Sequence, residues 1–157
     1  MHTRRFLLPD LRATHQLGRA LGQAIQLPAQ IALDGDLGSG KTSLSQGIAQ
    51  GLGITEHVSS PTFALIHAYP FSAGQLLHLD LYRLETQESL WDLDLEFQLQ
   101  QCPTLLLVEW QSKFSEAWFL PARLQIVLEH SPTGRMAELF FDDHSLLDPD
   151  DLPDTLL

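Results

Sequence analysis

The segment GDLGSGKTS, which runs from Gly35 to Ser43, limits what this chain can fold into more than any other stretch. It fits the pattern G-x-x-x-x-G-K-[ST], with Gly35, Gly40, Lys41 and Thr42 at the four fixed positions. A loop of small residues can surround a polyphosphate with backbone N–H groups, and the helix that follows adds the positive end of its dipole. In this pattern the lysine reaches the β- and γ-phosphates, and the Thr hydroxyl ligates Mg²⁺.

The residues on either side of the loop supply the context that the pattern requires. Residues 30–34 (QIALD) have the composition of a short buried strand, and Leu44, Ile48 and Leu52 recur at the spacing of one helix face. The alternative is a glycine-rich turn that happens to contain Lys-Thr. A strand, a loop and a helix in this order favour the phosphate-binding interpretation.

The other segments predict an α/β protein in which only part of the sheet is parallel. We expect an edge strand at 5–8, a helix at 11–26 capped by Asp10, and a helical stretch at 86–101 that is interrupted near Asp92. A further buried strand is expected at 104–110, and antiparallel hairpins at 62–82 and 123–141. The prediction is a P-loop NTPase fold, formed as a single three-layer domain with a mixed parallel/antiparallel sheet over residues 1–141. Residues 142–157 are expected to form an acidic, flexible tail.

Composition excludes several classes of function. The formal net charge is −11 with only two lysines, which argues against gripping a nucleic acid without a partner. No apolar run reaches the length of about 18 residues that a transmembrane helix needs, and the N-terminus does not resemble a signal peptide. The single cysteine, Cys102, cannot form an internal disulfide. We therefore expect a cytoplasmic protein without a membrane partner.

Two acidic residues are candidates for the chemistry beside the loop. Glu109 follows four apolar residues, and Asp80 lies in a strand-like run followed by Arg83. Because ligands bind outside the carboxyl ends of strands in open α/β sheets, one acid is expected to hold Mg²⁺ and the other to orient the attacking water or sense the γ-phosphate. The residues alone leave open which does which. The alternative is a strand-end carboxylate that pairs with Arg83 or caps a turn.

Three other positions carry weaker signals. The SSPT segment, residues 59–62, follows the loop's helix where a nucleotide-sensing switch often lies, although the residues alone favour an ordinary Ser/Pro turn. Trp110 is placed either beside a nucleotide or in the core. His78 is expected to be a hydrogen-bonded packing residue rather than a base, and the histidines show no metal-ligand spacing.

Four motifs in order resemble the bacterial TsaE (YjeE) family. They are GDLGSGKTSLSQGIAQGLG, VSSPTF, HLDLYRL and LLLVEW, and the similarity covers roughly residues 10–140. The resemblance implies a partner-dependent ATPase required for threonylcarbamoyladenosine (t6A) formation on tRNA. It also implies that TsaD and TsaB are the partners, and that they transfer the threonylcarbamoyl group to adenosine 37. The tRNA would then meet this chain only indirectly, which agrees with the acidic charge.

The resemblance also implies roles for individual residues. Thr42 and Glu109 would ligate Mg²⁺, Asp80 would be the essential acid near the γ-phosphate, and Thr62 would be switch-like. Positions implied to contact ATP are Thr14 and Gly134–Arg135 near the adenine, Trp110 beside the site, and Gly38, Ser39, Gly40, Lys41, Thr42 and Ser43 around the phosphates. The chain departs from the family pattern around residues 90–98 and in its acidic tail.

Two other classes compete with this interpretation. A small-molecule P-loop kinase has this length and loop, but it needs arginines to cover the transferring phosphate, and only three arginines follow the loop. A GTPase switch requires the Asn-Lys-x-Asp element for guanine, and the chain contains no asparagine. A kinase would phosphorylate a metabolite without any protein partner, whereas the TsaE interpretation predicts weak ATPase activity that changes when TsaB and TsaD are added.

Overall fold

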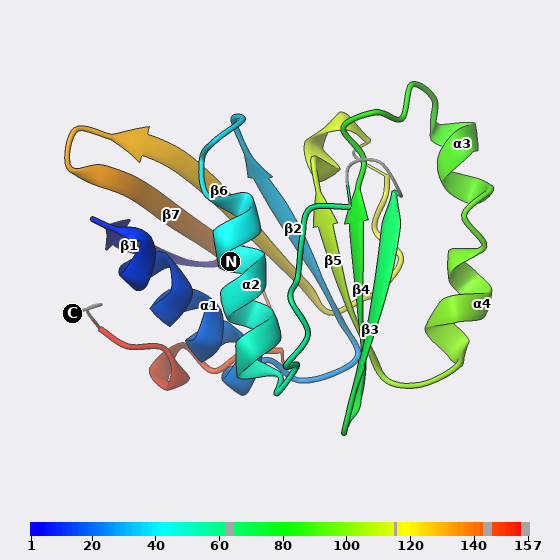
Figure 1. Cartoon of the computed structure of the whole chain (residues 1–157), viewed down its shortest axis with the longest axis horizontal. Coiled ribbons are helices and arrows are strands. Elements are labelled where there is room, and N and C mark those ends of the chain that lie inside the picture. Colours follow the sequence, from blue (N-terminus) through cyan, green and yellow to red (C-terminus); the bar gives the residue numbers. More distant parts are fainter. Residues whose placement is uncertain (62–64, 115, 143–145, 155–157) are drawn as a thin grey trace.

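A twisted sheet lies between two pairs of helices in the computed structural model, which describes residues 1–61, 65–114, 116–142 and 146–154 (Figure 1). The strands of these described parts are β1 (His2–Leu8), β2 (Ala29–Gly35), β3 (Ile66–Phe71), β4 (Gly74–Asp80), β5 (Thr104–Glu109), β6 (Arg123–Ser131) and β7 (Gly134–Phe141). The helices are α1 (Leu11–Ala24), α2 (Lys41–Gly51), α3 (Gln87–Trp91) and α4 (Leu95–Gln100), with single 3₁₀ turns η1 (Gln111–Lys113) and η2 (Pro149–Asp151).

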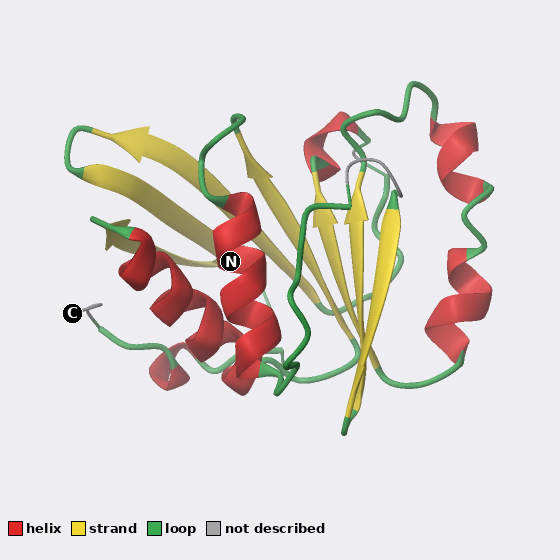
Figure 2. Ribbon diagram, in the orientation of Figure 1, coloured by secondary structure: helices red, strands yellow, loops and turns green. Residues whose placement is uncertain are grey.

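The seven described strands form one mixed sheet in the order β1-β7-β6-β2-β5-β4-β3. Its four central strands, β6, β2, β5 and β4, are parallel to one another. The outer strands β1, β7 and β3 pair antiparallel. The predicted α/β P-loop fold with a mixed sheet is therefore confirmed. Figure 2 shows the arrowheads of β2, β5 and β4 at the same upper edge of the sheet, so their carboxyl ends meet there.

Two apolar clusters cover opposite faces of the sheet. On one face, Leu17 and Leu21 of α1 and Leu44 and Ile48 of α2 are fully buried against strand residues such as Ile31. On the other face, Leu90 of α3 and Leu95 of α4 pack with side chains from β4 and β5. Every residue of β5 is buried, because this central strand is covered on both faces.

Most predicted elements are present, with shifted ends. Asp10 caps α1 as expected, because its Oδ1 accepts a hydrogen bond of 2.8 Å from Ala13 N. The helix ends at Ala24 rather than at Gln26, since Ile25 adopts an extended backbone. The helical stretch near Asp92 is interrupted, as predicted, into α3 and α4. Among the described residues, every helix is too short or too polar to cross a bilayer.

The described part of the acidic tail packs against the start of the chain. Leu146, Leu147 and Leu152 are buried in the cluster that also contains α1 and α2. Gln26 N donates to the Leu146 carbonyl over 2.9 Å, and Arg4 Nη1 donates to the Pro149 carbonyl over 3.0 Å. These leucines are interspersed among acidic residues, so a segment of acidic composition still presents apolar side chains to the core. The domain boundary at residue 141 and the flexibility of the tail stay predictions.

Candidate functional site

The predicted phosphate loop connects β2 to α2 at the carboxyl edge of the parallel strands. Gly38 and Gly40 have φ angles of 74° and 104°, in the left-handed region that glycine adopts readily. No described side chain caps the first turn of α2, so its backbone N–H groups can bind an anion. A cavity of about 380 Å³ opens here, lined by Leu37, Gly38, Gly40, Lys41, Thr42, Ser43, Ser60, Asp80, Tyr82, Glu109, Trp110 and Arg135.

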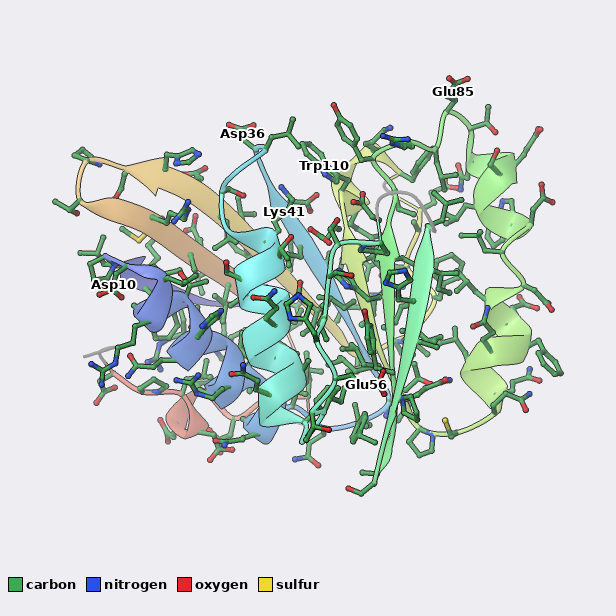
Figure 3. The ribbon with its side chains drawn as sticks, in the orientation of Figure 1. Asp10, Asp36, Lys41, Glu56, Glu85 and Trp110 are labelled. Carbon is green, nitrogen blue, oxygen red and sulfur yellow. The ribbon has the colours of Figure 1, made fainter. Side chains whose placement is uncertain are left out.

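Lys41 is one of two cationic side chains that line this cavity, with Arg135. Its Nζ donates to the carbonyls of Gly35 and Asp36 over 2.6 and 2.9 Å, and it lies 4.5 Å from the centre of the Trp110 ring. Figure 3 shows Lys41 at the start of α2 with Trp110 nearby. Burial lowers the pKa of Lys41 below its ordinary value, although nearby carboxylates, Glu109 foremost, oppose this effect.

The two predicted acids end neighbouring strands and lie opposite each other. Asp80 is the last residue of β4 and Glu109 the last of β5, and the two are register partners. Both are almost completely buried, with 4% and 2% of their surface exposed. Asp80 Oδ1 accepts from Tyr82 N over 2.9 Å, and its Oδ2 accepts from Ser60 Oγ over 3.4 Å. Glu109 Oε2 lies 2.7 Å from Nε2 of His78, which fits the prediction that His78 is a hydrogen-bonded packing residue.

The cavity wall is completed by residues from distant segments. Trp110 has a φ of 60°, and its ring centre lies 5.0 Å from that of Tyr82. Arg135 Nη2 donates to the Gly38 carbonyl over 2.9 Å, so the start of β7 contacts the phosphate loop. Glu109, Asp80, Trp110 and Arg135 therefore line the same cavity as Lys41.

Four other predicted residues, Thr14, Gly35, Ser39 and Gly134, do not line the cavity. Ser39 is fully buried, and a Cβ added to Gly35 would lie only 2.5 Å from its Oγ. Thr14 is buried in α1 and donates to the Asp10 carbonyl over 3.3 Å. At Gly134, a Cβ would lie 2.4 Å from the Leu8 carbonyl, so this glycine allows the turn into β7 to approach β1 closely.

One predicted residue, Thr62, lies outside the described residues, so the structure does not place the predicted switch position. Its described neighbour Ser60 reaches Asp80.

The sequence did not single out Tyr82, Leu37 or Asp34. Tyr82 and Leu37 line the cavity, and the position of Tyr82 two residues after Asp80 was the available signal. Asp34 is the penultimate residue of β2 and is 7% exposed, and its Oδ1 accepts from Ser112 N over 3.0 Å. This bond holds η1, the turn that follows Trp110, against the end of β2. Asp34 therefore supports the site from below rather than lining it.

The oxygen atoms around the cavity fit a hard divalent cation better than a transition metal. Thr42, Asp80 and Glu109 contribute one hydroxyl and two carboxylates, the ligand type that Mg²⁺ prefers when phosphates and water supply the remaining positions. Within the described residues, no group of three or more His, Cys, Asp or Glu side chains could hold a metal by itself. A cation here would therefore need ligands from a bound phosphate.

Comparison with known proteins gives one consistent family. Residues 8–137 match the family model described as "Threonylcarbamoyl adenosine biosynthesis protein TsaE". A Nostoc protein described as "tRNA threonylcarbamoyladenosine biosynthesis protein TsaE" is 44% identical over 140 residues, which cover 86% of this chain and 84% of that protein. A Synechocystis protein with the same description is 54% identical over 83 residues, and this match spans 53% of each chain. The crystal structure of Bacillus subtilis YdiB superposes with a TM-score of 0.65 at 30% identity, covering 92% of this chain and 88% of that one.

Proposed function

This chain belongs to the TsaE family of t6A biosynthesis proteins, and from that membership we propose that it binds and hydrolyses ATP with Mg²⁺ as the partner of TsaB and TsaD. The observation that carries the proposal is the meeting of Lys41, Asp80 and Glu109 at one cavity beside the phosphate loop. A phosphate-binding loop without strand-end acids would account for nucleotide binding alone. The two buried carboxylates supply the groups that phosphoryl transfer to water requires.

In this proposal each residue has a separate task. The backbone N–H groups of residues 38–43 hold the β- and γ-phosphates, and Lys41 exchanges its two carbonyl acceptors for phosphate oxygens. Thr42 and Glu109 ligate the cation. Mg²⁺, when bound, neutralises charge on the phosphates. Trp110 and Arg135 border the nucleotide, and the family resemblance assigns Thr14 and Gly134 to the adenine.

Asp80 is proposed to orient the attacking water and to connect the site to the segment after α2. Its Oδ1 is already held by Tyr82 N, while its Oδ2 accepts the longer bond from Ser60. Ser60 belongs to the SSPT segment that includes Thr62, the proposed switch residue. Docking of TsaB and TsaD would order this segment against Asp80 and complete the site. Hydrolysis would then reset the partner complex between cycles.

The proposal places this chain in the cytoplasm and leaves contact with tRNA to its partners. The net charge of −11 supports this division of labour, because phosphate backbones repel an acidic surface.

The test is ATP hydrolysis by the purified chain, measured alone and with TsaB and TsaD added. We expect slow hydrolysis alone, stimulation by the pair, and loss of nucleotide binding in Lys41→Ala. Asp80→Ala should retain nucleotide binding and lose stimulated hydrolysis. Hydrolysis that is unchanged by the pair, together with no complex, would overturn the partner assignment. Wild-type affinity for ATP in Lys41→Ala would overturn the nucleotide site itself.

A further inference from the structure

A buried imidazole lies directly beneath the two carboxylates of the site. On the same face of β4, His78 precedes Asp80 by two residues, one pleat deeper in the sheet. Its surface is completely buried, and its Nε2 lies 2.7 Å from Glu109 Oε2 on the neighbouring strand. Because Asp80 and Glu109 are register partners, this contact runs diagonally across the β4–β5 pair.

Among the described residues, Glu109 is the one hydrogen-bond partner of this imidazole. A carboxylate without a proton only accepts hydrogen bonds, and in that pairing Nε2–H is the donor to Oε2. The other ring nitrogen, Nδ1, is buried without a hydrogen-bond partner among the described residues. A buried ring with only one of its two nitrogens hydrogen-bonded is less favourable in a strand interior than a leucine, the residue found on either side of it at positions 77 and 79. Packing alone would therefore favour an apolar side chain here, and the hydrogen bond to Glu109 is what distinguishes the histidine.

We propose that His78 is a positioning residue for Glu109. By holding Oε2 toward the protein interior, His78 leaves Oε1 as the oxygen that faces the cavity, where the proposed function places the cation. A ligating carboxylate that is fixed by a buried donor loses less orientational freedom when the metal binds, and such outer donors contribute strongly to metal affinity. The inference rests on the proposed nucleotide–Mg²⁺ site and adds a residue that is neither a ligand nor in contact with the nucleotide.

The experiment compares His78→Leu, which removes the donor, with His78→Gln, whose amide nitrogen can replace Nε2. Binding of ADP is measured by calorimetry, first with chelator and then at increasing Mg²⁺ concentrations. We expect the Mg²⁺ concentration that gives half-maximal enhancement of ADP binding to be at least about tenfold higher for His78→Leu than for the wild type. The affinity for ADP without metal should change by less than about twofold. His78→Gln should recover a large part of the Mg²⁺ response.

The matched control is His67→Leu, on the neighbouring strand. His67 lies directly opposite His78 in the β3–β4 pair, and its Nδ1 interacts with Tyr69 Oη over 3.2 Å. Loss of this imidazole should leave the Mg²⁺ response unchanged. A loss as large as that in His78→Leu would mean that any imidazole removed from this face disturbs the sheet, and would overturn the assignment.

A double-mutant cycle separates action through Glu109 from a general effect on the fold. In a Glu109→Gln background, His78→Leu should add no further change to the Mg²⁺ response, because the carboxylate it orients is already gone. Additive effects would overturn the inference, as would a wild-type Mg²⁺ response in His78→Leu. If His78→Leu fails to fold, the test rests on His78→Gln. A folded His78→Gln whose Mg²⁺ response is far weaker than that of the wild type would then overturn the inference. If the ADP affinity of the wild type does not depend on Mg²⁺ concentration, the proposed function itself would be overturned.

Discussion

At the scale of single residues, Lys41 is subject to opposing demands. Phosphate binding needs a charged ammonium at the start of α2, yet burial disfavours that charge and lowers the pKa of Lys41 from its ordinary value of 10.5. Glu109, Asp80, Asp34 and Asp36 oppose the shift. The two carbonyl acceptors of Nζ belong to the loop itself, and in the proposed function they would be exchanged for phosphate oxygens.

The lowered pKa of Lys41 predicts a specific pH dependence of stability. Between its lowered pKa and 10.5, the folded chain has released a proton that the unfolded chain still binds. The free energy of unfolding therefore rises with pH in this window and is level below it. We expect urea unfolding of the wild type, relative to Lys41→Met, to show this rise on approaching pH 10.5. A difference between the two chains that is independent of pH would contradict it.

At the scale of elements, pairs of glycines allow the backbones of α1 and α2 to approach each other closely. Gly18 faces Gly47, and Gly22 faces Gly51. A Cβ at Gly18 would lie 2.7 Å from Gly47 Cα, and one at Gly22 would lie 2.3 Å from the Ile48 carbonyl. Because α2 begins with the phosphate loop, the spacing between these helices also sets where Lys41 and Thr42 stand above the sheet.

Widening this helix contact should disturb both stability and the site. In Gly22→Ala the added methyl group overlaps the backbone of α2, which cannot yield as a side chain would. We expect the free energy of unfolding to fall by about 1–3 kcal/mol, despite the better helix propensity of alanine, and ADP affinity to fall with it. Gln23→Ala, at the adjacent exposed position, is the control and should change stability by less than about 0.5 kcal/mol. If Gly22→Ala and Gln23→Ala were equally stable to heat, α1 and α2 would be able to move apart without a loss of stability, contrary to this prediction.

At the scale of the whole molecule, the two ends of the described chain hold each other. The buried leucines of the tail complete the cluster that contains α1 and α2, and Arg4 of β1 reaches the Pro149 carbonyl and the Asp154 carboxylate. The ion pair with Asp154 is exposed and adds little. Apolar burial is therefore the main contribution of this segment, although its composition is dominated by acid.

The tail should consequently contribute to global stability. Leu147 is fully buried, so Leu147→Ala is expected to lower the free energy of unfolding by about 2–5 kcal/mol through lost burial and a residual cavity. Asp151→Ala, at an exposed position of the same segment, should be nearly neutral. Chemical denaturation of both variants measures the difference. Indistinguishable unfolding midpoints would mean that the tail packs too weakly to support the core.

The sequence by itself determined the features that depend on neighbouring residues. The glycines and Lys-Thr of residues 35–43 specify their loop locally, and the strand–loop–helix order around them follows from short-range periodicity. The cap at Asp10, the interruption near Asp92 and both hairpins are likewise encoded in adjacent residues. Of these features, the phosphate-loop segment is one of the four motifs that carry the resemblance to the TsaE family.

Only the tertiary structure decided which distant segments meet. The pairing of β4 with β5 brings Asp80 opposite Glu109 and His78 beneath it, and the pairing of β6 with β2 carries β7 and Arg135 to the phosphate loop. The contact between the facing glycines of α1 and α2 and the burial of the tail leucines also bring together segments that are distant in the sequence. Strand order and helix contacts arise from burying apolar faces that lie far apart in the chain, so no pattern within a single segment specifies them.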